Sequence, residues 1–446
     1  MKSSLRVMRS RHTSTGDVAL AMHRATRTVA HVRRQAEPVP AARRAARVGY
    51  LLDHFPCGSH RFVLQEILEL ESRGIDVQVF SLGMPDGRLD DTALALARVH
   101  SSVCYFFADT EIGGRAPNGT MFAGGMAPEV VGSGMTSRAA HWMARHVAAR
   151  NIEHLHAHGA SETTDIVREA GRLTGVGYSF TVHAQDLNQR AAPSVCEKVL
   201  EARFAVALSD FDHARLNRIC GRGAADKLHR IPMSVDPDEF RFSKTAAHDR
   251  HSILTIGPLA GSSGFADLID AIRILRDRGR LVHLTILGEG GFDEALRTRI
   301  DGAQLSERVQ VIANASRREL ATLMREHTVL VLPWTVDDAD RDVLANLVLE
   351  AMAGGLPVLS TDVPSIRELI DDGLSGRIIS ACDPSGLAGA LGTFFGSPRL
   401  RESIAVNART TVERVFAARH NVSRLASLFV DAVARPPLGS ETLAGN

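Results

Sequence analysis

The sequence predicts an α/β protein with two doubly wound lobes, each built on a mainly parallel sheet. The chain has 446 residues, which is too long for one ordinary domain and sufficient for two. Short apolar runs alternate with longer amphipathic stretches, the pattern of strand, helix and strand in a parallel sheet. The stretch 231–240 contains two prolines and interrupts this alternation, so we interpret it as the linker between the lobes.

The first lobe is expected to cover residues 48–235. Val48–Leu52 forms a short apolar run typical of a buried strand, and Pro56 and Gly58 mark the loop that follows. Ser59 can cap the next helix, which Gly74 ends. The expected strands are 48–52, 77–80, 154–157, 178–182 and 204–208. Residues 84–137 are weakly patterned and are expected to form an irregular insert.

The second lobe is expected to cover residues 250–415. Its expected strands are 253–256, 284–287, 309–312, 329–332 and 357–360, with helices between them. Apolar residues at helical spacing predict a last helix over 418–433. Doubly wound lobes bind ligands outside the carboxyl ends of their strands, so the cleft between the lobes is the expected active site.

The composition is that of a globular protein with no general affinity for nucleic acid. Charged residues make up 23% and hydrophobic residues 44% of the chain, and the net charge is +1. No run of about 18 apolar residues is free of charge, so we expect no transmembrane helix. The five cysteines are scattered, without a CxxC pair, and are expected to be free thiols in a reducing cytoplasm.

Residues 1–47 form a basic arm, in which Lys2 and ten arginines face only Asp17 and Glu37. The arm has no apolar core typical of a secretory signal, although its composition also fits a transit peptide. Three interpretations stay open: a disordered arm, a contact with anionic lipid, and an extension ahead of a true start at Met8 or Met22.

The strongest local motif starts at Asp342 and reads DVLANLVLEAMAGGLPV. Asp342 and Glu350 are eight positions apart, about two helical turns, so a helix would present both carboxylates on one side. Such a pair can accept hydrogen bonds from sugar hydroxyls, and the helix N-terminus beside Val343 and Leu344 offers N–H groups to a diphosphate. An ordinary amphipathic helix with two exposed acids explains the spacing equally well.

Two further patterns lie at strand ends or along strands. Gly288 opens a glycine-rich turn after the strand 284–287, where a nucleotide could approach the backbone closely. His154, His156 and His158 alternate along one strand and therefore share a face, as metal ligands could. Because no acidic residue stands at ligand spacing beside them, we expect no metal.

Several segments together resemble the family-4 (group 1) glycosyltransferases. They are IEHLHAHGA at 152–160, YSFTVHAQDL at 178–187, LTILGEG at 284–290, the motif at Asp342, and DGLSG at 372–376. The similarity extends from Val48 to about Val433 and is greatest to the colanic-acid and amylovoran type of exopolysaccharide transferases. It implies the GT-B fold, in which two Rossmann-like lobes flank an interlobe cleft and a C-terminal helix, here 418–433, returns to the N-terminal lobe.

The resemblance also implies roles for individual residues. Glu350 would bind the ribose of a nucleotide sugar, Asp342 would contact the transferred sugar, and His183 would lie beside the reacting sugar. Gly58 and Ser59 would lie near the donor phosphates. The reaction would retain the anomeric configuration and need no metal or other cofactor, because cations and helix N–H groups neutralise the diphosphate.

The chain departs from the family pattern where the donor phosphates should bind. Relatives carry an arginine and a lysine at the positions of Pro258 and Ser263, and neither of these side chains supplies charge. Losing one such donor costs about 3–4 kcal/mol of transition-state stabilisation. Arg61 or Arg341 would then have to substitute.

The resemblance implies a cytoplasmic hexosyltransferase that uses a nucleotide sugar, extends a lipid-linked glycan and contacts the inner face of the membrane peripherally. Nucleic acid is not an expected partner. A catalytically impaired GT-B protein, acting as a partner or regulator in polysaccharide assembly, is the alternative. A nucleotide-sugar epimerase on the same fold is a third, weaker interpretation.

Overall fold

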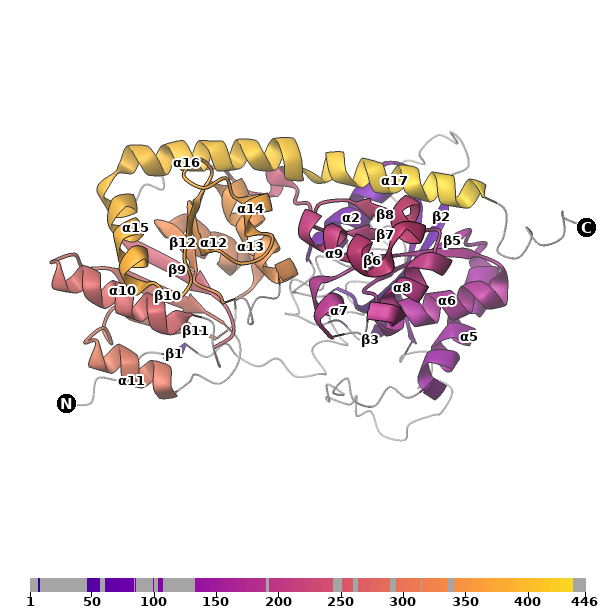
Figure 1. The fold of residues 1–446 in the computed structure, drawn as a ribbon, viewed down its shortest axis with the longest axis horizontal. Helices are drawn as coiled ribbons and strands as arrows, with labels where there is room; N and C mark the ends of the chain where they lie inside the picture. The colour runs from indigo at the N-terminus through magenta and orange to yellow at the C-terminus, as the bar shows by residue number, and fades with distance from the viewer. Residues whose placement is uncertain are drawn as a thin grey trace, which may run out of the picture. The chain divides into compact units, whose positions relative to one another are not determined.

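The computed structural model describes two compact units, each with a seven-stranded parallel sheet (Figure 1). The described residues are 7–8, 46–56, 61–83, 85, 99, 103–106, 133–189, 192–243, 251–259, 264–288, 294–313, 315–335 and 341–435. Among them, residues up to Met233 and from Ala418 onward form the N-terminal unit, whereas Val7–Met8 and Ser234–Ala417 form the C-terminal unit. The expected α/β class with two parallel-sheet lobes is confirmed.

The sheet of the N-terminal unit has the order β4-β3-β2-β5-β6-β7-β8. Its strands are β2 (Arg47–His54), β3 (Asp76–Gly83), β4 (Cys104–Tyr105), β5 (His154–His158), β6 (Gly177–Val182), β7 (Phe204–Ala207) and β8 (Leu228–Arg230). Its helices up to β8 are α2 (Arg61–Ser72), α5 (Ser133–Arg150), α6 (Glu162–Thr174), α7 (Ala184–Gln189), α8 (Ala192–Glu201), α9 (Asp210–Cys220) and η2 (Arg222–Lys227). The central strands β5, β6 and β7 are buried along their whole length because helices cover both faces.

The sheet of the C-terminal unit has the order β1-β11-β10-β9-β12-β13-β14. Its strands are β1 (Val7–Met8), β9 (Ser252–Ile256), β10 (His283–Leu287), β11 (Val309–Ile312), β12 (Val329–Leu332), β13 (Val358–Thr361) and β14 (Arg377–Ile379). Its helices are η3 (Pro237–Glu239), α10 (Phe265–Asp277), α11 (Glu294–Gly302), α12 (Arg317–Glu326), α13 (Arg341–Gly354), α14 (Ile366–Leu369), α15 (Pro384–Gly396), α16 (Pro398–Thr411) and the π-helix η4 (Val412–Phe416).

Strand β1 is the one part of the basic arm that the structure describes before Ala46. Val7 pairs with Val311 and Met8 with Ile312, so these two residues extend the sheet beyond β11. The expectation of a disordered arm is therefore wrong at these two residues, because their backbone groups join the open edge of β11. The rest of residues 1–45 lies outside the described part of the chain.

The last helix, α17 (Ala418–Ala434), packs on α2 and β5 within the N-terminal unit. Its Phe429 ring lies 5.2 Å from the His156 ring and 5.9 Å from the Tyr50 ring, measured between centroids. Near its start, Asn421 donates a hydrogen bond of 3.3 Å to the carbonyl of Pro232. The helix thus packs on one face of the N-terminal core, where its Phe429 ring meets His156.

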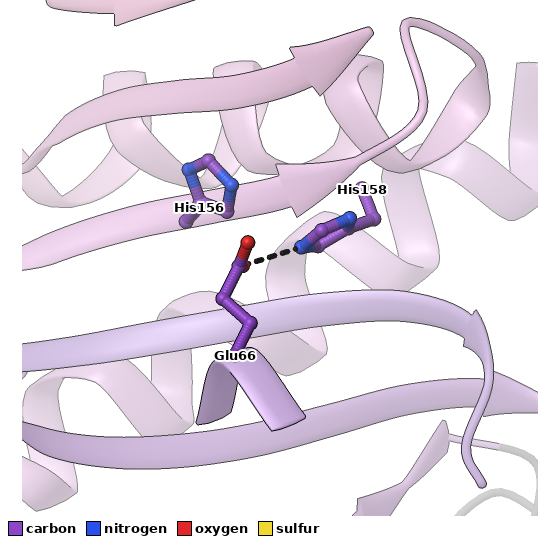
Figure 2. Close-up of side chains that lie close together, drawn as sticks. All are labelled: Glu66, His156 and His158. Atoms are coloured by element: carbon purple, nitrogen blue, oxygen red, sulfur yellow. Dashed lines mark hydrogen bonds and ion pairs between the residues drawn. The ribbon is translucent and has the colours of Figure 1, made fainter. Parts of the chain in front are cut away.

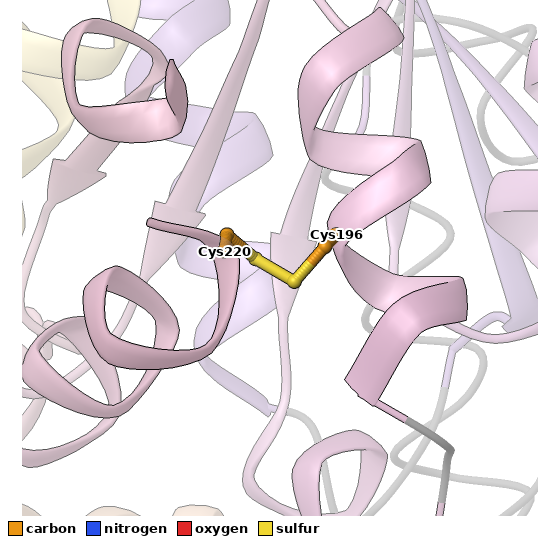
Figure 3. The surroundings of a disulfide bond; sticks show 2 residues. All are labelled: Cys196 and Cys220. Atoms are coloured by element: carbon orange, nitrogen blue, oxygen red, sulfur yellow. A yellow bond between two sulfur atoms is a disulfide. The ribbon is translucent and has the colours of Figure 1, made fainter. Parts of the chain in front are cut away.

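A disulfide joins Cys196 of α8 to Cys220 at the end of α9 (Figure 3). The expectation of free thiols is wrong for this pair, because the packing of α8 on α9 brings the two Cα atoms to 5.0 Å. Cys104 accepts weak hydrogen bonds from Gln78 and Arg150, and Cys382 is exposed. Cys57 lies outside the described residues. Since disulfides are rare in reducing compartments, the cysteines no longer argue for a cytoplasmic location.

No helix in the described ranges combines the length and the apolar character that crossing a membrane requires.

Candidate functional site

The site residues expected from the sequence fall into two groups, one in each unit. Asp342, Val343, Leu344, Glu350 and Gly288 belong to the C-terminal unit, and His183 belongs to the N-terminal unit. Gly58, Ser59 and Ser263 were also expected to contribute, and all three lie outside the described residues.

Helix α13 carries the acidic pair of the C-terminal unit. The helix is buried along most of its length, and it packs on β13 and α16. Asp342 is 4% exposed and Glu350 is 6% exposed, so the interpretation of two exposed acids on an ordinary amphipathic helix is wrong. Carboxylates are rarely buried to this extent without partners, and both residues make interactions within the protein. The two side chains are therefore held inside the C-terminal unit.

The end of α13 is held by an arginine from α16. Arg409 donates from Nη1 to the carbonyl oxygens of Ala353 at 2.9 Å and Pro237 at 2.7 Å. One of the last carbonyls of α13 thereby gains a charged donor, as helix C-termini require. This contact fixes the helix that presents Asp342 and Glu350.

Gly288 is required for packing at the carboxyl ends of β9 and β10. A Cβ atom at Gly288 would lie 1.9 Å from the carbonyl oxygen of Gly257, which is far inside contact distance. The Gly288 N–H donates to the carbonyl of Ile312 at 3.0 Å, and the Gly257 N–H donates to that of Leu287 at 3.0 Å. The structure thus shows a close approach at this turn between two backbone segments of the protein, at Gly288 and Gly257. Pro258, next in the chain, is exposed.

In the N-terminal unit, His183 follows the carboxyl end of β6 and is 9% exposed. Asp186 fixes the backbone around it, because its Oδ2 accepts the N–H of His183 at 2.9 Å and that of Ala160 at 2.6 Å. One carboxylate thus joins the loop after β5 to the loop after β6. Asp186 stands in the quoted segment YSFTVHAQDL, but the sequence did not single it out as a site residue.

The ring of His183 continues into a buried hydrogen-bonded chain. Nε2 of His183 lies 3.4 Å from Nδ1 of His158, and Nε2 of His158 lies 3.0 Å from Oε1 of Glu66. The hydroxyl of Tyr50 donates to the same Oε1 at 2.9 Å. Burial and the adjacent Glu66 raise the pKa of Tyr50 well above its usual value, so this hydroxyl keeps its proton. His183 is therefore linked through His158 to Glu66 and Tyr50 by a buried polar chain.

Glu66 was not predicted as a site residue, although its position in the sequence indicates a buried acidic side chain. It lies four positions after Phe62 and four before Leu70, so it falls on the apolar stripe of α2. An acidic residue on a buried stripe implies a partner in the core. Glu66 is 7% exposed, and its partners come from β2 and β5.

The expectation that the strand histidines have no acidic neighbour is wrong in space. Ligand atoms of Glu66, His156 and His158 all lie within 4.8 Å of one another, an arrangement that could hold a metal ion (Figure 2). However, the ring nitrogens of His156 already lie 2.8 Å from Ser179 Oγ and 3.1 Å from Thr181 Oγ1. Burial and the neighbouring histidines lower the pKa of His156 well below its usual value, as expected for a neutral ring. Hydrogen bonds within the protein therefore account for this cluster, and the absence of a metal stays a prediction.

Comparisons with known proteins agree with the resemblance seen in the sequence. Residues 236–411 match the model of the family described as glycosyl transferases group 1. The amylovoran biosynthesis glycosyltransferase of Erwinia amylovora is 31% identical over 169 residues, which cover 37% of this chain and 42% of that protein. A glycosyltransferase provisionally assigned to colanic acid biosynthesis in Escherichia coli is 24% identical over 382 residues, covering 78% of this chain and 90% of that protein. The chain thus aligns with under half of the first relative and most of the second.

Solved structures show the same fold at low sequence identity. A glycosyltransferase from Rickettsia africae has a TM-score of 0.69 at 15% identity, covering 88% of this chain and all of its own. The Anabaena protein Alr3699/HepE, solved in complex with UDP, has a TM-score of 0.65 at 14% identity and covers 86% of this chain and all of its own. The expected resemblance and the GT-B type of fold are confirmed.

Proposed function

We propose that the chain is a retaining glycosyltransferase of exopolysaccharide biosynthesis, because residues 236–411 match the model of the group 1 glycosyl transferases. It transfers a sugar from a nucleotide-diphosphate sugar to a lipid-linked glycan. The observation that carries the proposal is the pair of carboxylates, Asp342 and Glu350, which α13 places about two turns apart inside the matched segment. The names of the Erwinia and Escherichia relatives support the polysaccharide pathway.

In this proposal, α13 binds the donor at both of its acidic positions. Glu350 accepts hydrogen bonds from the ribose hydroxyls, and Asp342 accepts them from the transferred sugar. The N–H groups beside Val343 and Leu344 belong to the first turn of the helix, where they point toward a diphosphate. The complex of the Anabaena protein with UDP supports a nucleotide as part of the donor.

The diphosphate needs more positive charge than the helix supplies. A helix N-terminus contributes about half an elementary charge, and Pro258 contributes none. We propose that Arg61 or Arg341 supplies the remainder, because Arg341 directly precedes Asp342 and Arg61 starts α2 after the first loop. With such cations, the reaction needs no metal, and His183 lies beside the reacting sugar.

We also propose a lipid-linked glycan as the acceptor and the cytoplasmic face of the membrane as the location. Both come from the resemblance to exopolysaccharide transferases, which the names of two relatives support. The basic segment 1–47 offers peripheral contact with anionic lipid.

Nucleotide binding tests the role of Glu350. Calorimetry with UDP and GDP should show that Glu350→Ala weakens binding of the preferred nucleotide about tenfold to a hundredfold, the value of one or two hydrogen bonds to a charged group. Asp362→Ala is the matched control, because Asp362 lies in the same unit and pairs only at the surface with Arg367. Equal affinity in Glu350→Ala and parent, at matched melting temperature, would refute the assignment.

An impaired transferase acting as a partner in polysaccharide assembly is the second candidate. The observation that favours it is the exposed, uncharged Pro258, at the position where the family resemblance implies a cation. Hydrolysis of a panel of UDP- and GDP-hexoses separates the two proposals. Nucleotide binding without any hydrolysis supports the impaired protein, whereas turnover of one donor supports the enzyme.

A further inference from the structure

Tyr50, Glu66 and His158 form a buried polar chain that leads to His183, and none of these three residues takes part in the donor contacts proposed above. We propose that Glu66 and His158 are positioning residues, which hold the His183 ring in the tautomer with its proton on Nε2. Nδ1 then carries the lone pair and accepts a hydrogen bond from a hydroxyl of the donor sugar. This inference rests on the proposed role of His183 beside the reacting sugar.

The proton positions follow from the order of donors along the chain. Tyr50 keeps its proton, so its hydroxyl donates to Oε1 of Glu66, and that oxygen must be an acceptor. The 3.0 Å contact from His158 to the same oxygen therefore requires a proton on Nε2 of His158. Because burial disfavours the charged form of a histidine, we take the buried His158 ring as neutral, with its lone pair on Nδ1. The 3.4 Å contact with His183 consequently requires the proton on Nε2 of His183.

Packing holds each ring in the orientation that this chain needs. The Phe62 ring lies 5.9 Å from both the His158 and the His183 ring, measured between centroids. The Tyr50 ring lies 5.7 Å from that of His158. Asp186 fixes the backbone N–H of His183 at the same time. Because neither ring can turn without losing these contacts, one tautomer is selected.

A metal ion would use the same atoms differently. It would need a lone pair from one ring nitrogen of His156 and of His158, together with a Glu66 oxygen, and it would displace one of the hydrogen bonds that His156 makes to Ser179 and Thr181. The chain of hydrogen bonds keeps all of these contacts intact. The geometry therefore favours orientation of His183 over coordination of a metal.

Substitutions at His158 separate a positioning role from a structural one. In His158→Gln, the amide can donate to Glu66 and its carbonyl oxygen can accept from His183. In His158→Leu, both contacts are lost at similar volume. His154→Gln is the matched control, because His154 is a buried histidine of the same strand that bonds to Ser179 and not to His183.

Kinetics on the hexose donor that the parent hydrolyses fastest provide the first readout. We expect His158→Leu to lower kcat about tenfold to a hundredfold with little change in KM, because misplacement of a reacting contact acts on the transition state. His158→Gln should retain most of the parent rate, and so should His154→Gln. Loss of activity in His183→Ala with a parent-like rate in His158→Leu would overturn the inference while leaving the role of His183 standing.

Nitrogen NMR of the histidine rings tests the tautomer without any donor. In ¹⁵N-histidine protein, with His183 assigned from His183→Gln, Nε2 should carry the proton in the parent and in His158→Gln. His158→Leu should shift the ring toward a mixture of tautomers. The inference would be overturned by a proton on Nδ1 of His183 in the parent, or by an unchanged spectrum in a folded His158→Leu protein. It would also be overturned if the parent contained a stoichiometric metal ion that His158→Leu lost. If no donor is hydrolysed but the tautomer follows His158, the transferase proposal fails and the positioning of His183 stands.

Discussion

Removal of the Asp186 carboxylate should destabilise the N-terminal unit and impair the site together. In Asp186→Ala, the backbone N–H groups of His183 and Ala160 lose their acceptor in a buried position. Each buried N–H left without an acceptor costs about 1–3 kcal/mol, so the two together cost roughly 2–6 kcal/mol. Asp186→Asn keeps an acceptor oxygen of the same shape and should lose less than half of that amount.

Urea unfolding, followed by the near-ultraviolet signal, measures the stability of both variants against the parent. Donor hydrolysis measures the effect on the site, which should be larger for Asp186→Ala because the start of α7 and the His183 ring shift with the loop. The half-buried Ser423, whose hydroxyl donates to the carbonyl of His420 within α17, offers a control in Ser423→Ala. An Asp186→Ala protein as stable and as active as the parent would show that water replaces the carboxylate and that the loop needs no such anchor.

Three further outcomes are expected. Cys196→Ser with Cys220→Ser should lower the free energy of unfolding by about 3 kcal/mol, the chain-entropy value for a separation of 24 residues; unchanged melting with and without reductant would contradict this. Burial and Arg203 lower the pKa of His154 to about 3 from 6.5, so the unfolded chain binds the proton first and stability falls as the pH drops below 6.5. That loss is about 2 kcal/mol at pH 5 compared with pH 8, and acid titration of His154→Gln should show a correspondingly smaller decline; an equal decline would refute it. Ser263→Lys should strengthen UDP binding without changing uridine binding in calorimetry, and equal gains for both would argue against a phosphate contact.

The sequence alone was enough to predict the elements that are buried, because burial requires apolar residues at known positions. The central strands β5, β6, β9 and β12 were expected within a residue or two, because strands covered on both faces must be continuous apolar runs. Helix α13 was expected with Asp342 and Glu350 on it, since their spacing is a property of any helix. The short edge strands β4, β8 and β14 were not expected, because two or three residues carry no periodic signal.

Only the tertiary structure decided which distant residues meet. Glu66 and His158 are 92 positions apart, and no local pattern states that α2 lies against β5. The same holds for Cys196 and Cys220, whose pairing depends on how α8 packs on α9. The type of each residue indicates whether its side chain is buried. Which partner a buried polar atom meets depends on how the whole unit packs. The polar chain that ends at His183 therefore became visible only in the fold.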